Sequence, residues 1–203
     1  MKSFINVQDI GPLEKALAEA NEIKNDRFKY QHLGKNKTLL MIFFINSLRT
    51  LLSTQKAAIN LGMNVIVLDV NAGAWKLETE RGVIMDGDKS EHLLEAIPVM
   101  GSYCDLIGIR SFAGLTDREY DYAETIVSQF VKYSGRPVFA METATVHPLQ
   151  AFANSSSLIA RILSALVVTF VSFAKYKHTP SSTGNLTVFP NASRTLKCMQ
   201  SLQ

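Results

Sequence analysis

The chain has 203 residues, of which 47% are hydrophobic and 19% are charged, with 11 glycines and 6 prolines. These proportions are typical of a globular protein with one or two domains and exclude a disordered, collagen-like or low-complexity chain. Two cysteines, Cys104 and Cys198, are too few for a disulfide scaffold or a four-cysteine zinc site, so we expect both to stay reduced in a cytoplasmic protein. The first residues contain no apolar run or small-residue cleavage site and predict no signal peptide.

The charge is unevenly distributed along the chain. The formal net charge is +3, yet all 18 acidic residues precede position 155, and residues 155–203 contain five Lys and Arg residues and no acid. A basic chain favours a nucleic-acid partner only when its charge forms a patch on folded structure. Because the excess lies in a compositionally unusual tail, we expect no nucleic-acid partner.

The first third of the chain predicts two helices and two strands. Apolar residues at 3, 4, 7 spacing predict an amphipathic helix over 12–24, and a polar loop follows over 25–37. The apolar runs 38–45 (TLLMIFFI) and 64–70 (NVIVLDV) are typical of buried strands. Between them, Asn46 and Ser47 can cap a helix that Gly62 closes. One face of this helix is expected to carry its apolar residues, Leu48, Leu51, Leu52, Ala58 and Ile59.

The middle of the chain predicts a long loop and then further helices and strands. Residues 71–88 form the loop, which contains Trp75, the only tryptophan; loops of this length are usually functional or mobile. A helix is expected over 90–100 and a strand over 105–111 (DLIGIRS). Thr116 and Glu119 fit a capping box that opens a helix ending at Gly135. The residues expected to face inward on that helix are Ala123, Ile126, Val127 and Phe130.

A fourth strand is expected over 137–142 (PVFAME), and His147 begins another helix. The alternation of strands and helices predicts an α/β domain with a doubly wound, mostly four-stranded parallel sheet flanked by helices. Ligands of such sheets bind beyond the carboxyl ends of the strands. We therefore expect residues 46–50, the Trp75 loop, Arg110 and residues 147–150 to meet at that edge.

The start of the second helix is a candidate anion site. Ser47, Leu48, Arg49 and Thr50 follow a buried strand, where free backbone N–H groups and the positive helix end attract an anion. Two hydroxyl groups and a guanidinium could complete a phosphate cradle. The alternative is an ordinary helix cap with an arginine on the surface.

Four further side chains at the same edge are candidates, and three of them have both a functional and a structural interpretation. Arg110 ends an apolar strand, so it either points at a ligand or pairs with a carboxylate such as Asp105. A neutral His147 could donate a hydrogen bond to a carbonyl or phosphate oxygen, or it could cap its helix. Gln150 presents an amide one turn later, and Trp75 is either a packing residue or a ligand contact. The sequence contains no cluster with metal-ligand spacing.

Together, these segments resemble a known family. The motifs SLRT at 47–50, Arg110 and HPLQ at 147–150 are similar to the carbamoyl-phosphate signature of the aspartate/ornithine carbamoyltransferases. The stretches 73–82 (GAWKLETERG) and 85–88 (MDGD) resemble the branch that acts on N-acylated ornithine, and the text around 36–69 is most similar to its succinylornithine type. The resemblance covers about residues 1–153, which we take as a carbamoyl-phosphate-binding domain.

The resemblance implies carbamoyl phosphate as a ligand and requires no metal or organic cofactor. The phosphate is expected on Ser47, Arg49 and Thr50 and on the backbone of Leu48. Members of this family are trimers with shared sites, so Trp75 is expected to reach the phosphate of a neighbouring subunit.

The resemblance also implies a reaction, in which the δ-amine of an N-acylornithine attacks the carbamoyl carbon and phosphate leaves, as in arginine biosynthesis. Arg110 and His147 are the implied catalytic residues and polarise the carbamoyl carbonyl oxygen, while Gln150 holds the carbamoyl amide. Glu142 is expected near the acylornithine. Catalysis would consist mostly of positioning and of stabilising the developing oxyanion.

The chain departs from the family pattern at several positions. Leu51 and Val146 stand where this branch usually has arginine, and Ser90 fits neither the succinyl-type nor the acetyl-type enzymes. After residue 154 the resemblance stops, and residues 154–203 are interpreted as a divergent tail, with a shift of reading frame in the gene as a hypothesis. An apolar stretch over 158–174 is expected to form a helix that packs on the domain or an aggregation-prone segment. The alternative is a membrane anchor, which is disfavoured because a span needs about 20 residues and Arg161 interrupts this stretch.

Two functional hypotheses follow. The first is the carbamoyl-phosphate half of an N-acylornithine carbamoyltransferase, with weak or absent activity in isolation because the acylornithine domain is missing. The second is a non-enzymatic module that binds phosphate-like anions or associates with intact family subunits.

Overall fold

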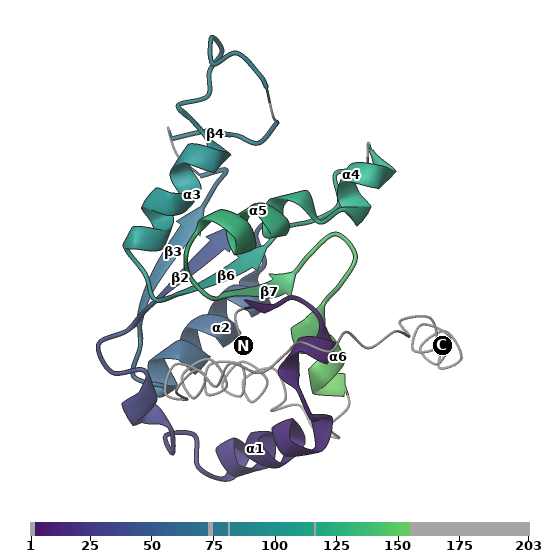
Figure 1. The fold of residues 1–203 in the computed structure, drawn as a ribbon. Helices are drawn as coiled ribbons and strands as arrows, with labels where there is room; N and C mark the ends of the chain where they lie inside the picture. The colour runs from purple at the N-terminus through teal and green to yellow at the C-terminus, as the bar shows by residue number, and fades with distance from the viewer. Residues whose placement is uncertain (1–2, 73–74, 81, 116, 155–203) are drawn as a thin grey trace, which may run out of the picture.

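The computed structural model describes residues 3–72, 75–80, 82–115 and 117–154 (Figure 1), and the structural statements below concern these ranges. The expected tail over 154–203, including the apolar stretch 158–174, lies outside them except for Asn154. Across the described ranges, no helix has the length and apolar character needed to cross a membrane.

The fold is an α/β domain around a five-stranded sheet in which all paired strands are parallel. The spatial order of the strands is β1 (Ser3–Phe4), β7 (Val138–Glu142), β6 (Leu106–Arg110), β2 (Thr38–Phe43) and β3 (Asn64–Asp69). The α/β class and the four expected strands are confirmed. The fifth strand, β1, has only two residues and therefore too little sequence to show a period.

Helices cover both faces of the sheet (Figure 1). One face packs against α1 (Leu13–Asn25), α2 (Leu48–Asn60) and α6 (Pro148–Asn154), and the other against α3 (Leu93–Ser102) and α5 (Thr125–Tyr133). Central strand β2 shows why its sequence is apolar throughout: its odd-numbered residues 39–43 join the first core and its even-numbered residues 40–42 join the second. A strand buried on both faces cannot alternate between apolar and polar residues.

Strand β3 is an exposed edge strand, so the expectation of a second strand buried on both faces is wrong. Ile66 and Val67 are 44% and 43% exposed. Among the described strands it pairs with β2 alone and lies at the edge of the sheet. Its apolar composition is therefore not explained by burial within the described part of this chain.

Helix α2 begins after Ser47 and is followed by Gly62, whose φ of +77° favours glycine, as predicted. Its expected apolar face, however, is largely on the surface, because Leu48, Leu52 and Ile59 are 50–72% exposed. The side that contacts the sheet carries smaller residues such as Ala57 and Ala58, both fully buried. Short side chains allow the helix to approach the sheet closely, so the larger ones face outward.

One expected helix begins later than predicted. The helix expected over 90–100 begins at Leu93, because Glu91–His92 form β5, which pairs with β4 (Leu77–Glu78) beyond the main sheet. The other described residues of the expected 71–88 loop lie on either side of β4 in the sequence. The short 3-10 turns η1 (Val7–Ile10) and η2 (Gln31–Leu33) precede α1 and β2.

The single helix expected before Gly135 is two helices, α4 (Arg118–Tyr122) and α5. Asp117 caps α4, since its Oδ1 accepts hydrogen bonds from the backbone N–H groups of residues 119 and 120; Thr116, the expected cap, lies outside the described residues. The break falls at Glu124, which has a left-handed φ of +49°. Ala123 is consequently exposed, whereas Val127 and Phe130 are buried as expected.

Candidate active site

The carboxyl ends of β2, β6 and β7 meet at one edge of the sheet, and Arg110 lies at the centre of this edge. Arg110 is only 7% exposed. Its Nε donates to Oε2 of Glu142 at 3.1 Å, and its Nη2 lies 2.8 Å from the same oxygen. Its Nη1 donates to the carbonyl oxygens of Ile45 at 2.7 Å and of Asn46 at 3.4 Å. The guanidinium thus joins the end of β7 to the segment that leads into α2.

Arg110 was expected either to point at a ligand or to pair with a carboxylate such as Asp105. It pairs with a carboxylate, but the partner is Glu142 rather than Asp105. Asp105 lies before β6 at the opposite end and accepts a hydrogen bond from the backbone N–H of Thr38 at 2.9 Å. A one-residue shift in the β6–β7 register explains the pairing, because Ile109 is opposite Ala140 whereas Arg110 is opposite Glu142. A bulge of this kind re-aims side chains beside functional sites. Here it brings Glu142 level with the guanidinium.

His147 caps α6 and is held as a neutral imidazole. The backbone N–H of Gln150 donates to its Nδ1 at 3.2 Å, so the ring proton of the neutral form is on Nε2. Burial lowers the pKa of His147 below its usual 6.5; the positive charge of Arg110 lowers it further, and the charge of Glu142 opposes both effects. The Nε2 atom lies 3.8 Å from Oε2 of Glu142, beyond hydrogen-bond distance. His147 therefore presents an N–H donor at neutral pH.

The start of α2 provides backbone donors beside this cluster. Ser47 is the helix cap: its Oγ accepts from the backbone N–H of Thr50 at 3.5 Å and from Thr50 Oγ1 at 3.1 Å. The first turn contains no acidic residue, and the side chain of Arg49 is exposed. The positive end of a 13-residue helix therefore faces the same edge, with no acidic residue in the first turn of the helix itself.

The two remaining predicted site residues, Gln150 and Trp75, differ in their connection to this cluster. Gln150 is half-buried in the first turn of α6, next to the imidazole that caps it. Trp75 is 67% exposed, so it is not a packing residue of this core, and its Nε1 donates to Oε2 of Glu91 at 3.1 Å. Figure 1 shows the neighbouring strand β4 beyond α3, away from α6.

The residues that position the loop before His147 were not predictable from the sequence. Glu124 Oε1 accepts hydrogen bonds from Thr143 Oγ1 at 2.7 Å, from the backbone N–H of Thr145 at 2.9 Å and from Thr145 Oγ1 at 2.5 Å. These bonds fix the loop between β7 and α6. No sequence motif links Glu124 to the loop between β7 and α6, so their contact could not be predicted. In the structure, the left-handed turn at Glu124 accompanies this contact. In the described ranges, no group of His, Cys, Asp and Glu could hold a metal ion.

Comparison with known proteins identifies the family of this domain. The model of the aspartate/ornithine carbamoyltransferase carbamoyl-P binding domain matches residues 2–159. The chain belongs to this family. It is 75% identical over 154 residues to N-succinylornithine carbamoyltransferase of Bacteroides thetaiotaomicron, a match that covers 76% of this chain and 48% of that protein. It is 38% identical over 161 residues to N-acetylornithine carbamoyltransferase of Xanthomonas campestris pv. campestris, covering 78% of this chain and 46% of the relative.

Solved structures agree with this assignment of the carbamoyl-P binding domain. A mutant N-acetyl-L-ornithine transcarbamylase, crystallised with carbamyl phosphate and N-succinyl-L-norvaline, matches with a TM-score of 0.70 and 36% identity, covering 76% of this chain and 46% of that one. The chain thus spans about half the length of the relatives that it matches. The family resemblance stated from the motifs is confirmed.

Proposed function

We propose that residues 1–153 bind carbamoyl phosphate as one half of an N-acylornithine carbamoyltransferase active site. The observation that carries the proposal is the cluster at the sheet edge, where the guanidinium of Arg110 and the neutral imidazole of His147 flank the same Glu142 oxygen, beside the start of α2. A ligand with a phosphate at one end and a carbonyl oxygen at the other matches a helix N-terminus next to two N–H donors.

The phosphate binds at the start of α2 in this proposal. The backbone N–H groups of Leu48 and Arg49 lie in the first helical turn, where they have no partner within the helix. The hydroxyl groups of Ser47 and Thr50 already bond to each other, and together they can turn toward a phosphate oxygen. The exposed guanidinium of Arg49 is free to fold over the anion. Leu51 packs against the core instead of adding a second charge here.

Arg110 and His147 hold the carbamoyl carbonyl oxygen. Within the described part of the chain, the hydrogen bonds of Arg110 to Glu142, Ile45 and Asn46 use four of its five N–H hydrogens and leave one on Nη2 for a ligand. His147 contributes its Nε2–H. Two donors that are fixed before the ligand arrives stabilise the negative charge that develops on this oxygen when an amine attacks the carbon. Gln150 is placed to accept from the carbamoyl amide.

Glu142 has two roles in the proposal. Its Oε2 orients Arg110, and its Oε1 has no hydrogen-bond partner among the described residues. A carboxylate oxygen at this position attracts the protonated δ-amine of an acylornithine. The protonated amine gives one proton to solvent, and its nitrogen then bonds to the carbamoyl carbon as the C–O bond to phosphate breaks. The second proton leaves the nitrogen with the phosphate, which departs as hydrogen phosphate. The residues assigned here account for carbamoyl phosphate and for the amine of the acylornithine, and none is assigned to the rest of that substrate.

Calorimetry with carbamoyl phosphate tests the proposal. Arg49→Gln removes one charge-assisted contact from an exposed side chain, so we expect affinity to fall about 10- to 150-fold with little effect on folding. Arg27→Gln, which removes an exposed arginine from the turn after α1, is the matched control and is expected to bind like the original chain. Equal affinity of the two variants, or the absence of carbamoyl phosphate binding, would contradict the site.

A subunit interface is also part of the proposal. The exposed leucines 48 and 52 and Ile59 on α2, with Ile66 and Val67 on β3, leave apolar surface that this domain does not bury. Contact with a second copy would cover it and would let Trp75 reach a neighbouring site. Light scattering after size-exclusion chromatography is expected to show a trimer, and Leu52→Glu is expected to dissociate it. A monomer at all concentrations would exclude this interface.

A further inference from the structure

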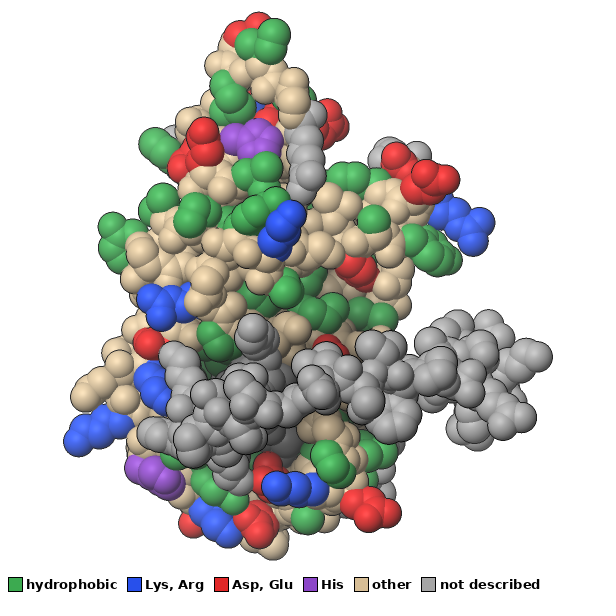
Figure 2. Space-filling view, viewed as in Figure 1, with side chains coloured by type: hydrophobic (Ala, Val, Ile, Leu, Met, Phe, Trp, Pro, Cys, Tyr) green, Lys and Arg blue, Asp and Glu red, His purple; other side chains and the backbone are tan. Residues whose placement is uncertain are grey.

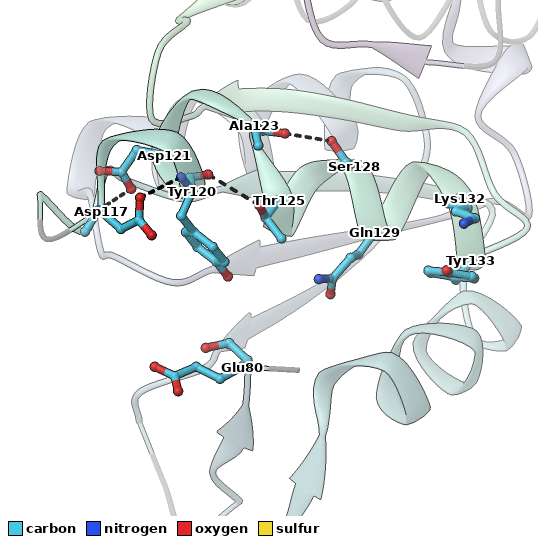
Figure 3. Close-up of a pocket in the computed structure, with 12 residues that line it drawn as sticks. Glu80, Asp117, Tyr120, Asp121, Ala123, Thr125, Ser128, Gln129, Lys132 and Tyr133 are labelled. Atoms are coloured by element: carbon cyan, nitrogen blue, oxygen red, sulfur yellow. Dashed lines mark hydrogen bonds between the residues drawn. The ribbon is translucent and has the colours of Figure 1, made fainter. Parts of the chain in front are cut away.

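A second cavity lies on the α5 side of the sheet, away from the Arg110 cluster. It has a volume of about 710 Å³ and lies between the α4–α5 segment and residues Thr79 and Glu80 beside β4 (Figure 3). Ligand sites for small molecules fall in this size range. None of the residues proposed to bind carbamoyl phosphate lines it.

A buried amide without a partner lies in the wall of this cavity. Gln129 on α5 is 2% exposed, and among the described residues neither its Nε2 nor its Oε1 has a hydrogen-bond partner. Figure 3 shows its side chain pointing from α5 toward the side of the cavity formed by Glu80. Buried polar groups in native proteins are nearly always hydrogen-bonded, because an unpaired one is destabilising. A leucine would fill the same space without that cost, so the amide indicates a bound polar partner.

The charges around the cavity indicate the kind of partner. Three carboxylates line it, from Glu80, Asp117 and Asp121, against the single ammonium of Lys132. The two aspartates accept hydrogen bonds from backbone N–H groups of the surrounding loop, which fixes their positions. Tyr120 adds an aromatic ring to the lining. An acidic wall with an aromatic face favours a planar cation, and Lys132 favours a carboxylate at the other end.

We propose that this cavity binds a small zwitterion that carries a guanidinium group, of the size of a basic amino acid. The guanidinium donates to the carbonyl oxygen of Gln129 and to the carboxylate of Glu80, and it stacks on Tyr120. The ligand carboxylate lies toward Lys132. The site is independent of the carbamoyl phosphate site, so either one can exist without the other.

Calorimetric titration of the full 203-residue chain with L-arginine tests the inference, with L-citrulline as the matched neutral ligand. Arginine is expected to bind at least about tenfold more tightly than citrulline, because a urea group carries no charge for the acidic wall. Gln129→Leu and Glu80→Gln are each expected to weaken arginine binding by about tenfold or more. Gln55→Leu on α2 and Glu95→Gln on α3 are control substitutions of the same kinds outside the cavity.

Thermal unfolding of every variant verifies that it is folded. If Gln129→Leu does not fold, Glu80→Gln alone tests the cavity, because Glu80 is exposed and its substitution is not expected to disturb folding. The proposal is overturned if arginine does not bind, if citrulline binds equally well, or if the cavity variants bind arginine like the two controls. Carbamoyl phosphate binding is measured in the same samples, so failure of one site is distinguishable from failure of the other.

Discussion

The ion pair between Arg110 and Glu142 allows a quantitative prediction. The side chains are 9% and 21% exposed, so the pair is intermediate between a surface pair, worth about 0.2–1 kcal/mol, and a buried one, whose disruption costs about 3–5 kcal/mol. Glu142→Gln keeps an oxygen that can accept from the guanidinium but removes the charge that compensates it. We expect the free energy of unfolding to fall by about 2 kcal/mol, because Arg110 remains buried without a counter-charge.

Urea unfolding at neutral pH measures this change, and a double-mutant cycle isolates the pair. Once Arg110→Met has removed the cation, adding Glu142→Gln should cost much less than it does alone, which gives a coupling energy of about 1–2 kcal/mol. Glu95→Gln, an exposed carboxylate on α3, is the control and should change stability by less than about 0.5 kcal/mol. A Glu142→Gln effect as small as that of the control would refute the view that this carboxylate holds the guanidinium in place.

Three other predictions concern protonation, packing and thiol reactivity. Burial lowers the pKa of His147 below 6.5, so the unfolded chain binds a proton on this residue more readily than the folded chain does. The free energy of unfolding should therefore fall as pH decreases below about 6.5. In the variant His147→Gln, the urea midpoint should depend less on pH between about pH 7.5 and pH 5. A methyl group on Gly108 would lie 2.5 Å from the ring of Phe139, so Gly108→Ala should lower the unfolding free energy by about 1–3 kcal/mol; an unchanged urea midpoint would contradict this contact. Burial raises the pKa of the Cys104 thiol to about 11. Iodoacetamide at about pH 8 should therefore leave this thiol unmodified in the folded chain and alkylate it in urea. Rapid alkylation without urea, measured by mass spectrometry, would contradict the burial of Cys104.

The elements that depend on local pattern were predictable from the sequence. The run TLLMIFFI gave the central strand because only a strand covered on both faces is apolar throughout, and Gly62 ends α2 at a positive φ as predicted. The meeting of Arg110 and His147 at one edge was also predictable, because parallel strands present their carboxyl ends on the same side.

The features that depend on tertiary context were not predictable. Apolar periodicity cannot tell whether a face covers its own sheet or another molecule, so the outer face of α2 and the edge position of β3 were misjudged. The pairing of Arg110 with Glu142 requires a register shift after Ile109, which leaves no trace in composition or spacing. The break at Glu124 likewise depends on acceptor bonds to Thr143 and Thr145, about twenty residues away in the sequence.

A crystal structure of the chain with carbamoyl phosphate tests the central claim most directly. Figure 2 shows one face of the domain, and the ligand could in principle rest on any cationic side chain at its surface. We predict phosphate oxygens on the backbone N–H groups at the start of α2 and the carbonyl oxygen within hydrogen-bond distance of Arg110 Nη2 and His147 Nε2. A ligand bound at another surface, with these donors unengaged, would contradict the account.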